Sequence, residues 1–200
     1  MSETGQTGFS WSEENEKKAQ YHIAKYPEGR QQSAVMPLLD IAQRQNGGHV
    51  TVEIMEYIAD YLDMPAIKVQ EVATFYTMYN HKPIGKHHVQ VCGTTPCWLR
   101  GSDDIMSACK KRLGINKGET TEDGMFTLSE VECAGACVNA PVVAIDDDYF
   151  EDLSPESVTA LLDALAKGEE IKPGPQIDRQ TSAPAGGLTT LKDFDAKEAE

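Results

Sequence analysis

The sequence has no apolar run near the ~18 residues that a membrane-spanning helix needs. Its start has neither the basic stretch and apolar core of a secretory signal nor the arginines of a mitochondrial transit peptide. Positive charge is scarce, with 18 Lys and Arg against 32 Asp and Glu and a formal net charge of −14. Phosphate backbones and anionic lipid would repel such a chain. We therefore expect a soluble, cytosolic protein with no nucleic-acid partner and no direct membrane insertion.

Motifs for nucleotide binding and dithiol chemistry are also missing. No G-x-G-x-x-G follows a predicted strand, no G-x-x-x-x-G-K-[ST] occurs, and no two cysteines form C-x-x-C. No nucleophile–base pair can be argued either, so no catalytic residue is predicted. The five cysteines are an odd number, and cytosolic thiols stay reduced, which excludes a disulfide framework. The function must therefore be inferred from how the cysteines are spaced.

Residues 12–82 are predicted to form a helical bundle behind a flexible lead, residues 1–11. Apolar residues recur at helical spacing in segments separated by Gly, Asn or Pro. Four helices are expected, at about Ser12–Lys25, at about Ser33–Gln45, after Thr51 and from Pro65. Ser12 suits the N-cap of the first, and Pro65 suits the first position of the fourth.

Residues 83–168 are predicted to form a compact α/β unit. Strands are expected at His88–Cys92, Phe126–Val131 and Val142–Ile145, and helices at Ser102–Leu113 and from Ser154 to Ala166. The order of strand, helix, strand, strand, helix is typical of a thioredoxin-like domain with a central mixed sheet, which makes the whole chain α+β. Residues 169–200 are rich in Gly, Pro, Ala and charge. This tail is expected to be disordered by default, or extended along a partner.

Four of the five cysteines form two close pairs. Cys92 and Cys97 lie in CGTTPC, and Cys133 and Cys137 lie in CAGAC, each pair just past a predicted strand. In a [2Fe–2S] cluster each iron takes two thiolates and two bridging sulfides, so two short loops can hold one iron each. The intervening residues 98–132 fit a helix and a strand, which lets both loops reach one end of the sheet. The spacing favours a [2Fe–2S] electron-transfer site.

Zinc is the competing interpretation. Four cysteines also make a structural zinc site, although zinc pairs usually have two residues between the thiols. A zinc-stabilised interaction module without a redox role therefore stays open on spacing alone, as do unligated or redox thiols. His87 and His88 lack the interleaving of a Rieske centre and are expected at a strand edge or in solvent.

The fifth cysteine is expected to be structural. Cys109 has Ile105 and Leu113 four residues to either side, on one helix face, which is typical of a buried core thiol. The acidic run at residues 146–148 resembles an ion site, but turn chemistry explains it more simply.

The segments around the cysteines resemble a known family. The segments are VATFYTMY at 72–79, PIGKH at 83–87, VCGTTPCWLRG at 91–101 and VECAGACVNAP at 131–141. Together they are similar to the small [2Fe-2S] subunit of the NADH dehydrogenase module of respiratory complex I, the family of NADH-quinone oxidoreductase E subunits. The resemblance covers roughly residues 12–168 and is far more specific than the cysteine count.

The resemblance implies a helical bundle followed by a thioredoxin-like ferredoxin domain, with Cys92, Cys97, Cys133 and Cys137 as the ligands of one [2Fe–2S] cluster. It implies an electron-carrying subunit of an enzyme, NADH:quinone oxidoreductase, that docks on a flavoprotein subunit and exchanges single electrons with its FMN. That partner would also hold the NADH site. Other peripheral-arm complex I subunits are the further partners that it implies.

The location implied is the cytoplasmic side of the inner membrane, as a peripheral part of the complex, or the matrix side for a mature organellar form. Subunits of the same kind serve NAD-linked hydrogenases and formate dehydrogenases. The motifs near the cysteines do not separate these alternatives.

Overall fold

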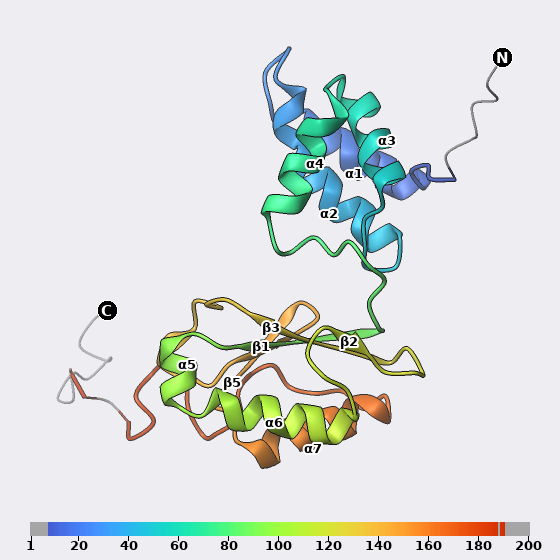
Figure 1. Ribbon diagram of the computed structural model, residues 1–200. Helices are drawn as coiled ribbons and strands as arrows, with labels where there is room; N and C mark the ends of the chain where they lie inside the picture. Colours follow the sequence, from blue (N-terminus) through green and yellow to red (C-terminus); the bar gives the residue numbers. More distant parts are fainter. Residues whose placement is uncertain (1–7, 188, 191–200) are drawn as a thin grey trace. The chain divides into compact units, whose positions relative to one another are not determined.

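The computed structural model describes residues 8–187 and 189–190, in two compact units whose boundary along the chain lies between Ile84 and Gly85 (Figure 1). The first unit is built from helices, and the second surrounds a sheet. Residues 1–7 of the expected lead and residues 188 and 191–200 of the expected tail lie outside the described residues.

The four expected helices of the first unit are all present. They are α1 (Glu13–Ile23), α2 (Val35–Gln45), α3 (Val52–Leu62) and α4 (Ala66–Phe75), with a short 3-10 helix, η1 (Gln31–Ala34), before α2. The side chains of Ser12 and Thr51 accept hydrogen bonds from the N–H groups of Asn15 and Ile54, which caps α1 and α3. Pro65 is the N-cap residue of α4 rather than its first helical residue, so this helix begins one residue later than expected.

One apolar core holds these helices together. Its largest fully buried side chains are Leu38, Leu39, Ile54, Ile58 and Leu62. Phe9 and Trp11 pack against the same core, and Trp11 makes edge contacts with the rings of Tyr57 and Tyr61. The end of the expected lead, from Phe9 onward, is therefore packed rather than flexible, because its aromatic side chains cover apolar surface.

The second unit contains a six-stranded mixed sheet in the order β2-β3-β1-β4-β5-β6. The strands are β1 (His87–Cys92), β2 (Glu119–Thr120), β3 (Phe126–Val131), β4 (Val143–Ile145), β5 (Asp148–Glu151) and β6 (Gly174–Pro175). The central pair, β1 and β3, is parallel, whereas β4 is antiparallel to β1. A parallel pair requires a crossover, and residues between β1 and β3 supply it through a helix.

Helices α6 (Ser102–Leu113) and α7 (Pro155–Ala166) lie side by side along the sheet (Figure 1). Ser154 and Ser157 form a reciprocal capping box at the start of α7. The core between helices and sheet includes fully buried Val89, Ile105, Leu128, Phe150 and Leu162. This packing places β1 and β3 at the centre of the unit's core.

Several short elements were not expected from the sequence. They are α5 (Thr95–Leu99), the 3-10 turn η2 (Cys137–Asn139), and the strands β2, β5 and β6. The expectation of disorder is wrong for residues 174–183 of the tail. Gly174 and Pro175 extend the sheet as β6, parallel to β5, and the residues that follow make specific side-chain contacts.

Gly85 lies where the second unit begins, in very close contact with its sheet. A Cβ at this position would lie 2.9 Å from backbone atoms of Phe126 and 3.0 Å from the carbonyl oxygen of Gly124. Backbone cannot move aside as a side chain does, so Gly85→Ala is expected to lower the free energy of unfolding by about 1–3 kcal/mol. Urea unfolding measures this loss. Gly186→Ala is the control, because no atom lies within 4 Å of its Cβ position; equal stabilities of the two variants would contradict the prediction.

Candidate metal centre

The parallel pairing of β1 and β3 brings the two cysteine loops to one edge of the sheet. Cys92 is the last residue of β1 and pairs in register with Val131, the last residue of β3. Cys133 follows two residues later. Because the carboxyl ends of parallel strands lie at the same edge, loops that leave β1 and β3 meet there.

The short helices α5 and η2 place the second cysteine of each pair. Cys97 lies in α5, which starts after Thr94 and has Pro96 in its first turn, where a missing N–H costs nothing. Cys137 begins η2. Cys92 and Cys97 are buried in a small cluster with Ala140 and Val142, whereas Cys133 and Cys137 are exposed. The site therefore has one buried and one exposed thiol pair.

Hydrogen-bond donors surround the sulfurs. The Sγ atoms of Cys133 and Cys137 are 3.5 Å apart, and the N–H of Gly135 donates to Cys133 Sγ at 3.4 Å. The Thr94 hydroxyl lies 3.4 Å from Cys92 Sγ, and the N–H of Ala134, from the other loop, also interacts with Cys92. Donors of this kind stabilise thiolates and tune a metal centre that thiolates hold.

The pKa shifts follow a pattern expected of close thiol pairs. Burial alone would raise the pKa of Cys92, but hydrogen bonds from the Thr94 hydroxyl and from backbone N–H groups lower it overall. Burial and the neighbouring Cys92 raise the pKa of Cys97 to about 11. The Gly135 N–H lowers the pKa of Cys133, and contact with Cys133 raises that of Cys137. Each pair thus has one sulfur favoured as a thiolate, the form that binds metal.

The donor set fits a cluster held by two pairs of thiolates. Two loops supply two cysteines each, which matches the two thiolates that each iron of a [2Fe–2S] cluster requires. Amide and hydroxyl donors lie next to the sulfurs, where they would tune such a cluster. Among the described residues, no group of three or more His, Cys, Asp or Glu side chains is arranged around a single ion position.

Comparison with known proteins identifies the family. The family model for the thioredoxin-like [2Fe-2S] ferredoxin matches residues 19–166. A Rickettsia bellii protein, named as the E subunit of NADH-quinone oxidoreductase, is 58% identical over 159 residues, which cover 80% of this chain and 95% of the relative. The chain belongs to the family of NADH-quinone oxidoreductase E subunits. The expected resemblance, fold class and iron–sulfur type of domain are thereby confirmed.

Other relatives in this family of E subunits agree. A Rhizobium meliloti protein, named as E subunit 1 of NADH-quinone oxidoreductase, is 54% identical over 187 residues, covering 92% of this chain and 68% of the relative. Among solved structures, an NAD+-reducing [NiFe]-hydrogenase in the air-oxidized state has a TM-score of 0.56 and 17% identity, covering 65% of this chain and 23% of the hydrogenase chain. The likeness to the hydrogenase concerns the fold alone.

The remaining candidate residues lie away from the cysteine loops. Cys109 is fully buried in the core of the second unit, as expected, and burial raises its pKa to about 12. Asp146 begins the turn between β4 and β5, and its carboxylate accepts hydrogen bonds from the His87 ring and the His88 N–H.

No helix in the described part of the chain is long and apolar enough to cross a membrane.

His88 is expected to make the second unit acid-sensitive. Burial lowers its pKa below the ordinary value of 6.5, with Asp146 opposing part of the shift. The unfolded chain then binds a proton more readily than the folded one, so stability present at neutral pH declines as pH falls below 6.5. Replacing His88 with Gln, which can still bond the Ser129 hydroxyl that lies 2.8 Å from His88 Nε2, should flatten that decline. Unfolding free energies at several pH values test this, and parallel pH curves for the two proteins would contradict it.

Part of the sulfur environment could be expected from the sequence. Small residues between the paired cysteines let backbone N–H groups approach the sulfurs, and the N–H groups of Gly135 and Ala134 do so. The contact of the Thr94 hydroxyl with Cys92 carries no such signal. Arg179 gave no indication of its proximity to Val138 and the second cysteine loop, because it lies 41 residues further along the chain and the tail showed no periodicity.

Proposed function

We propose that this chain carries one [2Fe–2S] cluster on Cys92, Cys97, Cys133 and Cys137, and exchanges single electrons with the FMN of an NADH-binding flavoprotein subunit of NADH:quinone oxidoreductase. The observation that carries the proposal is the meeting of two thiol pairs at one edge of the sheet, in a member of the family of NADH-quinone oxidoreductase E subunits. A bound cluster supplies one-electron chemistry.

The chain's own residues hold, shield and expose the site. Cys92 and Cys97 lie with Ala140 and Val142 in a buried apolar cluster that excludes water from one side. The N–H of Gly135 and the hydroxyl of Thr94 stabilise negative charge on the sulfurs. On the other side Cys133 and Cys137 are exposed, which leaves a route for electrons to and from a partner.

The partner is proposed to be a flavoprotein because this sequence lacks a nucleotide motif of its own. Exposed apolar side chains adjoin the cysteines in the sequence: Trp98 and Leu99 follow Cys97, and Val138 follows Cys137. Such residues suit burial against another subunit. We place the complex, with further peripheral-arm subunits, on the cytoplasmic side of the inner membrane, or on the matrix side for an organellar form.

Metal analysis and spectroscopy of protein purified anaerobically test the proposal. We expect about two iron and two acid-labile sulfide per chain, little zinc, and an EPR signal that appears only on reduction. With the flavoprotein co-expressed, NADH should produce the same signal, whereas without it NADH should not. Zinc without sulfide in cells competent for cluster assembly would support the structural zinc module instead and would overturn the electron-transfer role.

A further inference from the structure

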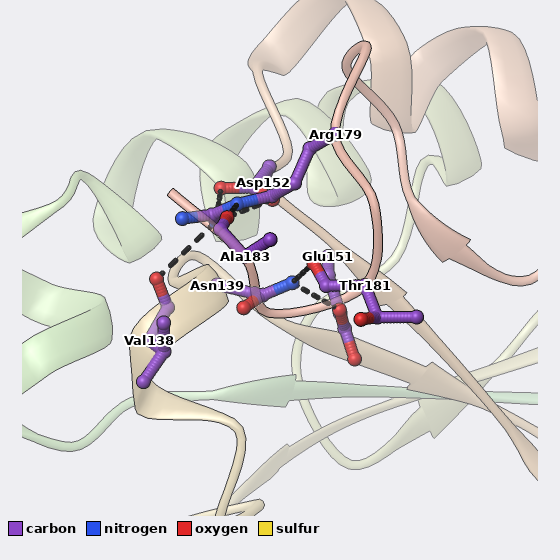
Figure 2. Close-up of polar contacts among 7 residues, drawn as sticks. All are labelled: Val138, Asn139, Glu151, Asp152, Arg179, Thr181 and Ala183. Carbon is purple, nitrogen blue, oxygen red and sulfur yellow. Dashed lines mark hydrogen bonds and ion pairs between the residues drawn. The ribbon is translucent and has the colours of Figure 1, made fainter. Parts of the chain in front are cut away.

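Residues 174–183, which we call the C-terminal strap, connect the tail to the second cysteine loop. The strap begins as β6, whose Gly174 pairs with Phe150 of β5. It then passes over the residues that follow Cys137, where Figure 2 shows Arg179 and Thr181 facing the 138–139 segment. Three stretches far apart in sequence, 138–139, 151–152 and 179–183, thus make one polar cluster.

Arg179 makes the most extensive contacts in this cluster (Figure 2). Its Nη1 donates to both carboxylate oxygens of Asp152, at 2.8 and 2.9 Å, and to the carbonyl oxygen of Val138 at 3.4 Å. Its Nε donates to the carbonyl oxygen of Ala183 at 2.7 Å, which closes the strap into a loop. The side chains of Arg179 and Asp152 are only 10% and 9% exposed. Removing one partner of a charge pair so shielded from water is destabilising, because it leaves the other charge without its counter-ion.

Asn139 forms the second connection between the strap and the cysteine loop. It is 1% exposed, and its Nδ2 donates to Glu151 Oε2 at 2.6 Å and to the carbonyl oxygen of Thr181 at 3.0 Å. The backbone carbonyl oxygen of Asn139 accepts a hydrogen bond from the N–H of Asp152 at 2.7 Å. The backbone immediately after Cys137 is therefore fixed by β5 on one side and by the strap on the other.

These contacts explain how an exposed cysteine can keep a defined position. Cys133 and Cys137 lack the apolar packing that holds Cys92 and Cys97, and the η2 turn has only three residues. Hydrogen bonds from an arginine whose side chain is largely shielded from water and from a buried asparagine replace that packing. The strap thus acts on the cysteine pair that is most open to solvent.

We propose that Arg179 is a positioning residue for Cys137: through the strap it holds residues 137–139 in place and so slows loss of metal from the exposed thiol pair. The role as a metal-retaining contact rests on the proposed function, because it takes Cys137 as a ligand. The effect on the mobility of the cysteine loop does not depend on the proposed function, since it concerns the polypeptide alone.

The test compares the full-length wild type with Arg179→Gln, Arg179→Lys and a control, Arg112→Gln, whose ion pair with Asp163 joins α6 and α7 at the surface. Hydrogen exchange of the metal-free chains reports on the loop. Release of iron to a chelator, measured on metal-loaded chains, reports on retention. For Arg179→Gln we expect about tenfold faster exchange in the 133–141 segment and about tenfold faster iron release, the scale of indirect ligand-orienting contacts.

Arg179→Lys keeps the charge but not the forked geometry. It should therefore show smaller increases in exchange and in iron release than Arg179→Gln. Arg112→Gln should match the wild type. If Arg179→Gln fails to fold, the double variant Asp152→Asn, Arg179→Gln removes both charges together and avoids an unpaired buried carboxylate. It should show the same fast exchange in 133–141.

Unchanged exchange in 133–141 would overturn the proposal. So would an equal rise in β1 and β3, since that would mean general destabilisation rather than positioning. Faster loop exchange with normal iron release would overturn the retaining role. If the wild type contained no iron and sulfide, the proposed function would fail separately, while the exchange measurement would still decide whether the strap holds the loop.

Discussion

Replacing Cys137 with alanine is expected to give a folded chain that cannot retain a [2Fe–2S] cluster. Cys137 is exposed and buries little surface, so its loss removes no core packing. One iron would lose a thiolate, and the remaining fifth cysteine, Cys109, is buried in the core of the unit and has its pKa raised to about 12. No spare thiolate can therefore substitute. Iron and sulfide should fall from about two each per chain to a small fraction of that value, and the EPR signal of the reduced protein should disappear.

Cys109→Ser is the matched control for the ligand assignment. It also removes one thiol, but it places a hydroxyl in an apolar environment between α6 and the sheet. The expected cost is about 1–3 kcal/mol of unfolding free energy, with metal and sulfide content unchanged. Normal cluster content in Cys137→Ala, or loss of the cluster in Cys109→Ser with the fold intact, would refute the assignment of ligands.

Leu128→Ala is expected to cause the largest loss of stability in the second unit. Leu128 lies in the middle of β3, is 0% exposed and pairs in register with Val89 of β1. Truncation at a site packed on all sides leaves a cavity that the surrounding sheet cannot close, which costs about 2–5 kcal/mol. Urea unfolding, followed by circular dichroism, should show a lower midpoint with little change in slope.

Leu99→Ala provides the comparison for that loss. Leu99 is 70% exposed at the end of α5, so its truncation should change the unfolding free energy by no more than about 0.5 kcal/mol. Similar losses in Leu99→Ala and Leu128→Ala would mean that β3 is not the centre of the core.

The long elements of the fold were predictable because each has a strong local signal. Apolar spacing located α1, α2, α3 and α6, and the β3 strand was predicted with its observed bounds, Phe126–Val131. The short elements carry no such signal. α5 has five residues, and β2 and β6 have two each, so their geometry depends on contacts with distant segments rather than on local preference.

The candidate site was predictable in its residues but not in its environment. All four thiols were indicated by the spacing of the two cysteine pairs and by the likeness of the surrounding segments to a known family. Spacing could not reveal that one pair is buried and the other exposed, because burial follows from how Ala140 and Val142 pack under Cys92 and Cys97. The contact between Arg179 and Asp152 was equally inaccessible, since a tail without periodicity gives no register to place it.

For the proposed cluster on four cysteines, the parallel pairing of β1 and β3 also determines when insertion can occur during biosynthesis. Residues 93–125 must emerge, fold back as a crossover and bring β3 beside β1 before Cys92 and Cys133 come near each other. Contacts between residues so distant in sequence form slowly, because the chain loses the entropy of loop closure before the contacts contribute favourable energy. A nascent chain released before residue 137 offers one thiol pair at most. Assembly machinery that delivers a preformed cluster therefore has to act after residue 137 has emerged, and chains stalled before that residue should contain no [2Fe–2S] cluster.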